Sequence, residues 1–247
     1  MDYTRYCSLT YNNKLLDQLI DGYTTINVDG RGILRRAVTS VDVPGRDGVF
    51  VTNQKLPPRY IVVYYLLKAE NSKTFLERLT TLHDSLKADS DVVIKFGDED
   101  YYRLGRLSES ENPPFDRLQG VGSFTLLCQD PYKYKNIDDL AGSPVTVPGT
   151  SLYPYKIQSI SVIFASDKTG FQVQNSTTGR KIVLTGDFVA GDVLQIYPEE
   201  NSILLNGENV MSRLDYIYSD WQEFKVNSGD VLLADESMTI SLVERAL

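Results

Sequence analysis

The single histidine, His83, is the first residue to consider for catalysis, because histidine is the usual general base near neutral pH. It follows Leu79 by four residues and precedes Leu86 by three, at the margin of an apolar stripe with helical spacing. Asp84 is its direct neighbour, and adjacent helical residues do not face each other. No Gly-x-Ser-x-Gly motif accompanies the pair. We therefore interpret His83 as a packing residue at the edge of a helix and predict no catalytic residue.

Carboxylates cluster at two places, Asp98-Glu99-Asp100 and Glu199-Glu200. A glycoside hydrolase needs two carboxyl groups that face each other across a cleft, about 5–10 Å apart and usually on different strands. Adjacent residues at turns do not meet this requirement, so we interpret both clusters as solvated turn charges. A glycan hydrolase is therefore only the third-ranked hypothesis for the function of this chain.

The sequence also lacks the residue patterns that a metal or cofactor site needs. One histidine without nearby cysteines cannot complete a zinc site. The Gly-rich segment from Pro44 to Gly48 has neither the lysine nor the following helix of a phosphate-binding loop. The sequence thus predicts no metal and no cofactor. The only two cysteines, Cys7 and Cys128, provide no disulfide framework, which is typical of a protein that folds in a reducing cytosol.

The formal net charge of −8 is distributed unevenly. Residues 1–135 contain 18 basic and 18 acidic side chains, whereas residues 136–247 contain 7 basic and 15 acidic ones. Such an acidic surface repels phosphates and anionic membranes. The apolar runs are too short to cross a bilayer. We therefore expect no specific nucleic-acid binding and no membrane association.

The charge step coincides with a Pro- and Gly-rich passage from Lys133 to Pro154, which predicts a domain boundary near residue 138. In domain 1–137, a cap at Asn71-Ser72 and five apolar residues at spacings of three and four predict a helix that ends near Ala88-Asp89. Those five residues are Phe75, Leu76, Leu79, Leu82 and Leu86. A short helix is possible at residues 15–20. The expected strands are residues 24–28, 37–43, 60–66, 92–96, 101–107 and 122–127, with a hairpin tip at Asp98-Glu99-Asp100. This order predicts an α+β domain, a sheet or split barrel with one helix packed across it.

Domain 138–247 alternates short apolar runs with turns such as Gly191-Asp192 and Asn206-Gly207, and it contains no credible helix. This pattern predicts an all-β sandwich or jelly roll. The expected strands are residues 145–147, 157–164, 171–174, 181–184, 193–197, 202–205, 222–226 and 238–243.

Aromatic residues are the remaining functional signal, with 16 tyrosines against 9 phenylalanines. Tyrosine combines apolar area with a polar tip, which suits protein interfaces and stacking on sugars. We interpret the single tryptophan, Trp221, as a core residue of the sandwich. If it were instead an exposed platform, the domain would be a carbohydrate-binding module that recognises host cell-wall sugars, and this is the alternative function.

Several segments in order resemble the distal tail protein family of siphophages, the tail-tip or baseplate adaptor. Val43 to Gly48 is similar to the family's Pro-Gly-Arg-x-Gly turn, and Tyr101 to Leu104 to its tyrosine-bearing strand. Gly122 to Tyr132 resembles the Gly-x-Phe…Asp-Pro-Tyr close of the first domain. In the second domain the similar pieces are Gly191-Asp192-Val193, Leu205-Asn206-Gly207 and the span from Trp221 to Gly229. One departure is Asn227 to Asp230, where the family commonly has a Pro-Gly-x-Asn turn.

The resemblance implies a structural virion protein at the tail tip, present in the host cytoplasm before assembly. It implies a homohexameric ring whose N-terminal domains surround a channel that DNA traverses, and a galectin-like sandwich as the C-terminal domain. The implied partners are further copies of the chain, the tail tube protein, the tail-tip hub protein and receptor-binding proteins.

Overall fold

The computed structural model describes residues 7–113 and 118–247 and divides the chain into two compact units. Unit 1 ends at Lys133 and unit 2 comprises Tyr134–Ala246. The division falls close to residue 138, and the strand β10 (Lys133–Asn136) spans it. The fold is mostly β. Among the described residues, α-helices occur in unit 1 and not in unit 2. None of the described helices is long and apolar enough to cross a membrane.

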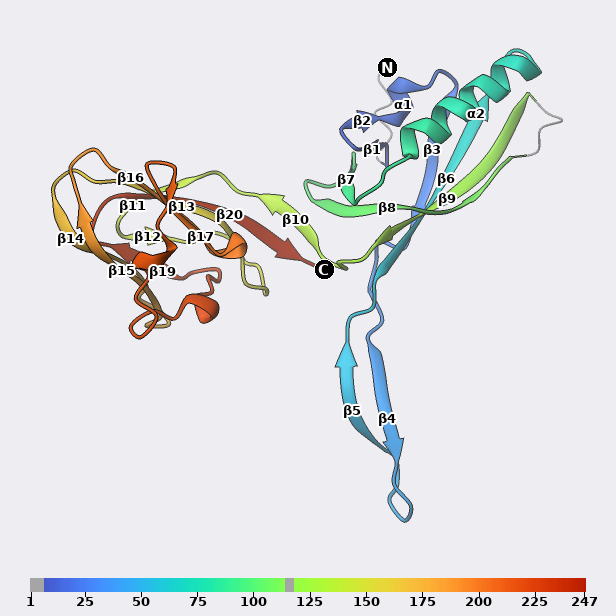
Figure 1. Ribbon diagram of the computed structural model, residues 1–247. Helices are drawn as coiled ribbons and strands as arrows, with labels where there is room; N and C mark the ends of the chain where they lie inside the picture. Colours follow the sequence, from blue (N-terminus) through green and yellow to red (C-terminus); the bar gives the residue numbers. More distant parts are fainter. Residues whose placement is uncertain (1–6, 114–117) are drawn as a thin grey trace. The chain divides into compact units, whose positions relative to one another are not determined.

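Four antiparallel strands form the main sheet of unit 1, in the order β3–β6–β9–β8 (Figure 1). The first half of β8 also pairs with β7, and a smaller ladder continues from β7 to β1 and β2. The sheet does not close into a barrel, so it is the open alternative of the two that the sequence predicted. The bounds are β1 (Leu9–Tyr11), β2 (Lys14–Leu15), β3 (Tyr23–Asp29), β6 (Arg59–Lys68), β7 (Val92–Phe96), β8 (Tyr102–Glu111) and β9 (Gln119–Cys128).

The strand β6 shows how this sheet acquires one buried face. Its sequence RYIVVYYLLK is almost entirely apolar, yet successive side chains point to opposite faces of a strand. Ile61, Val63 and Leu67 are fully buried, whereas Tyr60 on the other face is half exposed. The sheet therefore has a core face and an open face.

The helix α2 (Ser72–Leu86) packs on the core face, and Asn71 caps it by accepting a hydrogen bond from the Thr74 amide at 2.9 Å. Phe75, Leu82 and Leu86 are buried in the core of unit 1. The expected helix is confirmed, but the place of Leu76 in its apolar stripe was wrong, because this side chain is 50% exposed. A one-residue error rotates a helical position by about 100°, which carries Leu76 away from the sheet. The short helix considered near residue 15 is α1 (Leu16–Leu19).

The hairpin of β4 (Ala37–Asp42) and β5 (Val49–Lys55), with its connecting turn, extends from unit 1, and we call residues 37–55 the arm (Figure 1). All its residues are exposed, and its strands pair only with each other among the described residues. Gly45 and Gly48 adopt positive φ in the turn. The sequence predicted the first strand of the arm but missed the second.

Unit 2 is a sandwich of two sheets. One has the order β18–β17–β16–β13–β20, with β11 also paired to β20, and the other has the order β12–β19–β14–β15. The first sheet contains β11 (Leu140–Gly142), β13 (Lys156–Ile163), β16 (Val193–Tyr197), β17 (Ser202–Leu205), β18 (Glu208–Asn209) and β20 (Met238–Ala246). The second contains β12 (Val145–Thr146), β14 (Lys168–Asn175), β15 (Lys181–Phe188) and β19 (Val231–Ala234).

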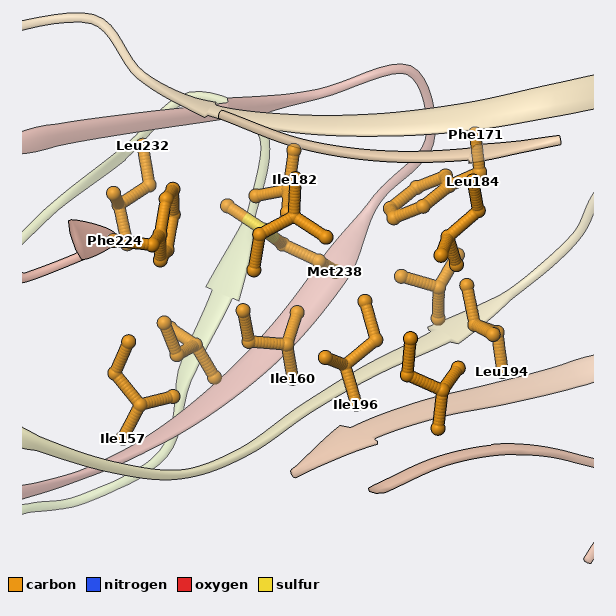
Figure 2. Packing of buried hydrophobic residues seen from close by; sticks show 14 of the residues in the cluster. Ile157, Ile160, Phe171, Ile182, Leu184, Leu194, Ile196, Phe224, Leu232 and Met238 are labelled. Carbon is orange, nitrogen blue, oxygen red and sulfur yellow. The ribbon is translucent and has the colours of Figure 1, made fainter. Parts of the chain in front are cut away.

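The core of unit 2 lies between these sheets, where inward side chains from both meet. Figure 2 shows Ile160 and Ile196 of one sheet facing Ile182 and Leu184 of the other. The Asn206-Gly207 turn joins β17 to β18 with both residues at positive φ, as its sequence predicted.

One expected strand of unit 2 was wrong. Residues 222–226 contain a short 3-10 helix, η3 (Trp221–Glu223), followed by a single bridge from Val226 to Tyr155. The alternating apolar residues are still buried, because Trp221, Phe224 and Val226 point into the core from this irregular segment. The two other 3-10 helices are η1 (Pro198–Glu200) and η2 (Met211–Arg213).

Candidate functional site

His83 lies on the exposed surface of α2, at the rim of a pocket of about 240 Å³ between α2 and the end of β8. The pocket is lined mainly by apolar side chains, among them Leu79, Leu86 and Phe124. Among the described residues, those that line it include no carboxylate and no cysteine. A serine nucleophile would need a histidine that a carboxylate orients, and this pocket does not supply one.

The cluster Asp98-Glu99-Asp100 forms the turn between β7 and β8, where the sequence placed a hairpin tip. Asp98 makes a two-bond ion pair with Arg31, with oxygen-to-nitrogen distances of 2.5 and 2.7 Å. The Arg31 guanidinium holds the pKa of the Asp98 carboxyl below its ordinary value, chiefly through these hydrogen bonds. Glu99 pairs with the buried Arg103. Both carboxylates therefore serve structural ion pairs and do not form a facing catalytic pair.

These ion pairs lie at the root of the arm. Arg59, which is only 2% exposed, donates from Nη1 to the carbonyl oxygens of Gly30 and Gly32 at 2.8 Å each. Its Nε donates to the carbonyl of Pro131 at 3.2 Å. The Arg31 guanidinium also lies 4.7 Å from the centre of the Phe96 ring. These contacts hold residues 30–32, which precede the arm, against β6, which follows the arm, and against β7.

The arm itself carries apolar side chains that nothing in the described chain covers. Six of them are between 42% and 58% exposed: Val38, Val41, Val43, Val49, Phe50 and Val51. An isolated two-stranded hairpin is marginally stable in water, and a contiguous apolar patch marks an interaction site. The arm is therefore a candidate interface.

The main sheet of unit 1 provides two further candidate surfaces, at its opposite edges. β3 pairs only with β6, and β8 beyond Arg106 pairs only with β9, among the strands that the structure describes. Asp17 covers part of the β3 edge by accepting hydrogen bonds from the amide and hydroxyl of Thr25, each at 2.9 Å. Unpaired strand edges are templates for pairing with another chain, so both edges are candidate contacts between copies.

The sequence interpretation missed β5 and hence half of the arm surface. The available signal was the apolar run Val49 to Val51, placed six residues after Val43 across a turn with two glycines. It was missed because neither face of the arm is buried, so the usual alternation of polar and apolar residues is absent.

In unit 2, Trp221 is 9% exposed, and its indole nitrogen donates to Asn201 Oδ1 at 3.0 Å. It is a core residue and offers no platform for stacking on a sugar. Glu199 and Glu200 lie side by side in η1. In the described parts of the chain, no group of three histidine, cysteine or acidic residues is arranged to hold a metal ion.

Comparison with known proteins gives a consistent result. Residues 153–245 match the family model described as "Siphovirus-type tail component, C-terminal domain". The distal tail protein of Bacillus phage SPP1 is 30% identical over 240 residues, covering 93% of this chain and 92% of that protein.

Solved structures agree in fold. The crystal structure of the SPP1 Dit protein superposes with a TM-score of 0.81 at 23% identity, covering 97% of this chain and 99% of that one. A chain of the phage P2 baseplate in its activated conformation with Ca gives a TM-score of 0.56 at 11% identity, with 97% and 98% covered. By its sequence identity and coverage, the chain belongs to the bacteriophage distal tail protein family.

Proposed function

We propose that this chain is a structural virion protein that forms a homohexameric ring joining the phage tail tube to the tail tip or baseplate. The proposal makes it a building block and not an enzyme. It extends the family membership with a specific role, which the surfaces of unit 1 support.

The observation that carries the proposal is the uncovered arm together with the two unpaired edges of one sheet. A surface that joins one edge of a molecule to the opposite edge of the next is heterologous, and such contacts close into rings or continue as filaments. The arm supplies additional apolar area that only another chain can bury. Both features are expected of a subunit whose function is assembly.

In this ring, residues 1–137 surround the DNA channel, and the open face of the main sheet is its lining. β6 contributes Tyr60, Val62, Tyr64 and Leu66 to that face, where strand alternation places them opposite the core. Across the four strands this face carries the basic residues Lys68 and Arg106 against the acidic Asp29, Glu109 and Glu111. A lining without a basic excess lets DNA pass without binding it.

Residues 138–247 form the second domain of this proposal, a galectin-like sandwich. The proposed partners are the tail tube protein on one side of the ring, the tail-tip hub protein on the other, and receptor-binding proteins at its periphery. The protein resides in the virion tail tip and is made in the host cytoplasm.

Two measurements test this role. Light scattering should give the mass of six chains for the purified protein, and antibody-bound gold should label the distal end of the tail in electron micrographs of the phage. The substitution Phe50→Asp on the arm should abolish the six-chain species. The matched control is Ile163→Asp, which changes a similarly exposed apolar residue on β13 of unit 2 and should leave the mass unchanged. Labelling of the capsid or the tail shaft instead would disprove the proposal.

A further inference from the structure

The pocket between α2 and β8 is an incomplete part of the core of unit 1. Leu82, Leu86 and Phe124, which line it, belong to the buried core, and Leu107 packs against that core from β8. Its volume of about 240 Å³ is several times the roughly 30 Å³ that one water molecule occupies in the liquid. Apolar walls facing an opening of this size lose packing contacts that a side chain would otherwise supply.

The sequence keeps this pocket open with small residues. β8 places Ser110 opposite Phe124, at a core-facing position where a large apolar residue would complete the packing of the helix on the sheet. Gly122 of β9 leaves room for Tyr65, since a Cβ at this glycine would lie 2.6 Å from the tyrosine hydroxyl. Burial raises the pKa of Tyr65 to about 12, so its hydroxyl stays neutral. The pocket thus has an apolar floor of leucine and phenylalanine side chains, with Thr80, His83 and Ser110 among its polar lining residues, and it lies at the β8 edge.

The opposite edge of the same sheet presents the complementary feature. Leu19 and Ile26 are each 47% exposed, and they are the large exposed apolar side chains of residues 7–29. Leu19 ends α1, which is fixed by the hydrogen bonds of Asp17 to Thr25. Ile26 is the bulged residue of β3, between the pairs that Thr25 and Asn27 make with β6. Both side chains are therefore held in place on the β3 edge.

Strand directions determine how these two edges meet in a ring. β3 and β8 are the outer strands of a four-stranded antiparallel sheet, so they run in opposite directions. In a ring whose axis runs along these strands and whose copies meet through the two edges, β3 of one copy lies antiparallel to β8 of the next. The start of β3 then lies beside the end of β8, where the pocket is.

We propose that Leu19, with Ile26 beside it, inserts into the α2–β8 pocket of the next copy and completes its core. The occupant of the pocket is thus a second copy of this chain. This inference rests on the ring of the proposed function and names the residues of one of its contacts.

Substitutions on each side of the contact test it. Leu19→Asp adds a charge to the inserting side chain, and Ser110→Trp fills the pocket. Each should convert the six-chain species to single chains in light scattering. The controls are Leu76→Asp, which changes an equally exposed leucine on α2, and Ser90→Trp, which changes an exposed serine outside the pocket. Both controls should assemble as the wild type does.

Mixing the two variants gives a sharper result. A Leu19→Asp chain retains an intact pocket, and a Ser110→Trp chain retains an intact Leu19, so an equimolar mixture should form dimers but no ring. Circular dichroism and thermal unfolding of each variant show whether it has folded. Two folded variants that give no dimer on mixing would overturn the inference.

Covalent linkage tests the same contact directly. In a Cys7→Ser background, the double variant Leu19→Cys, Ser110→Cys should give a ladder of multimers with a short bis-maleimide, whereas Leu76→Cys, Ser110→Cys should give none. If wild-type chains form rings while Leu19→Asp and Ser110→Trp also form them, the inference fails and the proposed function stands. If wild-type chains are single both in solution and at the tail, both fail.

Discussion

Two antiparallel hairpins of similar length, the arm in unit 1 and β14–β15 in unit 2, have opposite surroundings. Both contain β-branched and aromatic residues and both end in a turn with a glycine at positive φ. In β14–β15, Phe171, Val173 and Ile182 are buried against the facing sheet, whereas every residue of the arm is exposed. Both segments form a hairpin, but only β14–β15 is packed against the rest of its own unit. The proposed function assigns the cover of the arm to another molecule.

The largest effect is expected in the buried hairpin. Phe171→Ala removes a ring that is 2% exposed and packs edge-on against Phe164 at 5.8 Å. The lost transfer free energy and the cavity should lower the free energy of unfolding by about 3–5 kcal/mol. Urea denaturation followed by circular dichroism measures this change. A loss below about 1 kcal/mol would contradict the contrast between the two hairpins.

The second-largest loss of stability is expected at the root of the arm, where Arg59 holds the chain. Arg59→Met leaves the carbonyls of Gly30, Gly32 and Pro131 without their buried donor, so we expect a loss of roughly 3 kcal/mol in unfolding free energy. Hydrogen exchange should also show faster exchange in residues 30–36 and 56–59. The control is Arg46→Met at the exposed turn of the arm, which should change neither quantity.

A smaller, pH-dependent effect is expected at Asp98. Because Arg31 lowers the pKa of this carboxyl in the folded protein, the ion pair stabilises the fold above the unfolded value of about 4. This stabilisation is lost as the pH falls through the lower pKa of the folded state. Asp98→Asn should therefore cost about 1 kcal/mol at pH 7 and nothing at low pH. Unfolding curves measured from pH 7 down to pH 2 would show this, and a cost independent of pH would contradict it.

The smallest effect on stability is expected on the arm. Phe50→Ala changes a side chain that is 54% exposed, so the unfolding free energy of the single chain should change by less than about 0.5 kcal/mol. The same substitution should weaken assembly, which light scattering at decreasing concentration measures. A large loss of single-chain stability would show that the arm is packed against its own unit.

The sequence predicted the longer elements that bury one face, but it missed the short strands β1 and β19, although each of these also has buried residues. The helix at residues 72–86 and the strands around β6, β9, β13 and β16 follow from apolar spacing and turn residues. The strand prediction failed for residues 222–226, because their alternating apolar residues reach the core from a 3-10 turn and not from a strand. It also missed β5, since an exposed hairpin has no buried face to impose a period.

The candidate interface was harder to predict from the sequence than the fold. The family resemblance pointed to assembly, and the comparisons confirm the family. The surfaces themselves arise from long-range contacts, which place α1 with Leu19 beside β3 at one edge of the sheet and Ser110 in β8 at the other. Such placement depends on which strands pair, and neither residue has a local signature.

The isolation of the arm from the core has a consequence for how such proteins diversify. Substitutions at Val41 or Phe50 remove little packing within the described chain, so we expect them to affect the proposed contact with a neighbouring molecule more than folding. Mutations that change which chains are joined can therefore accumulate while the scaffold stays intact. Selection can tune compatibility between tail components separately from the durability of each subunit.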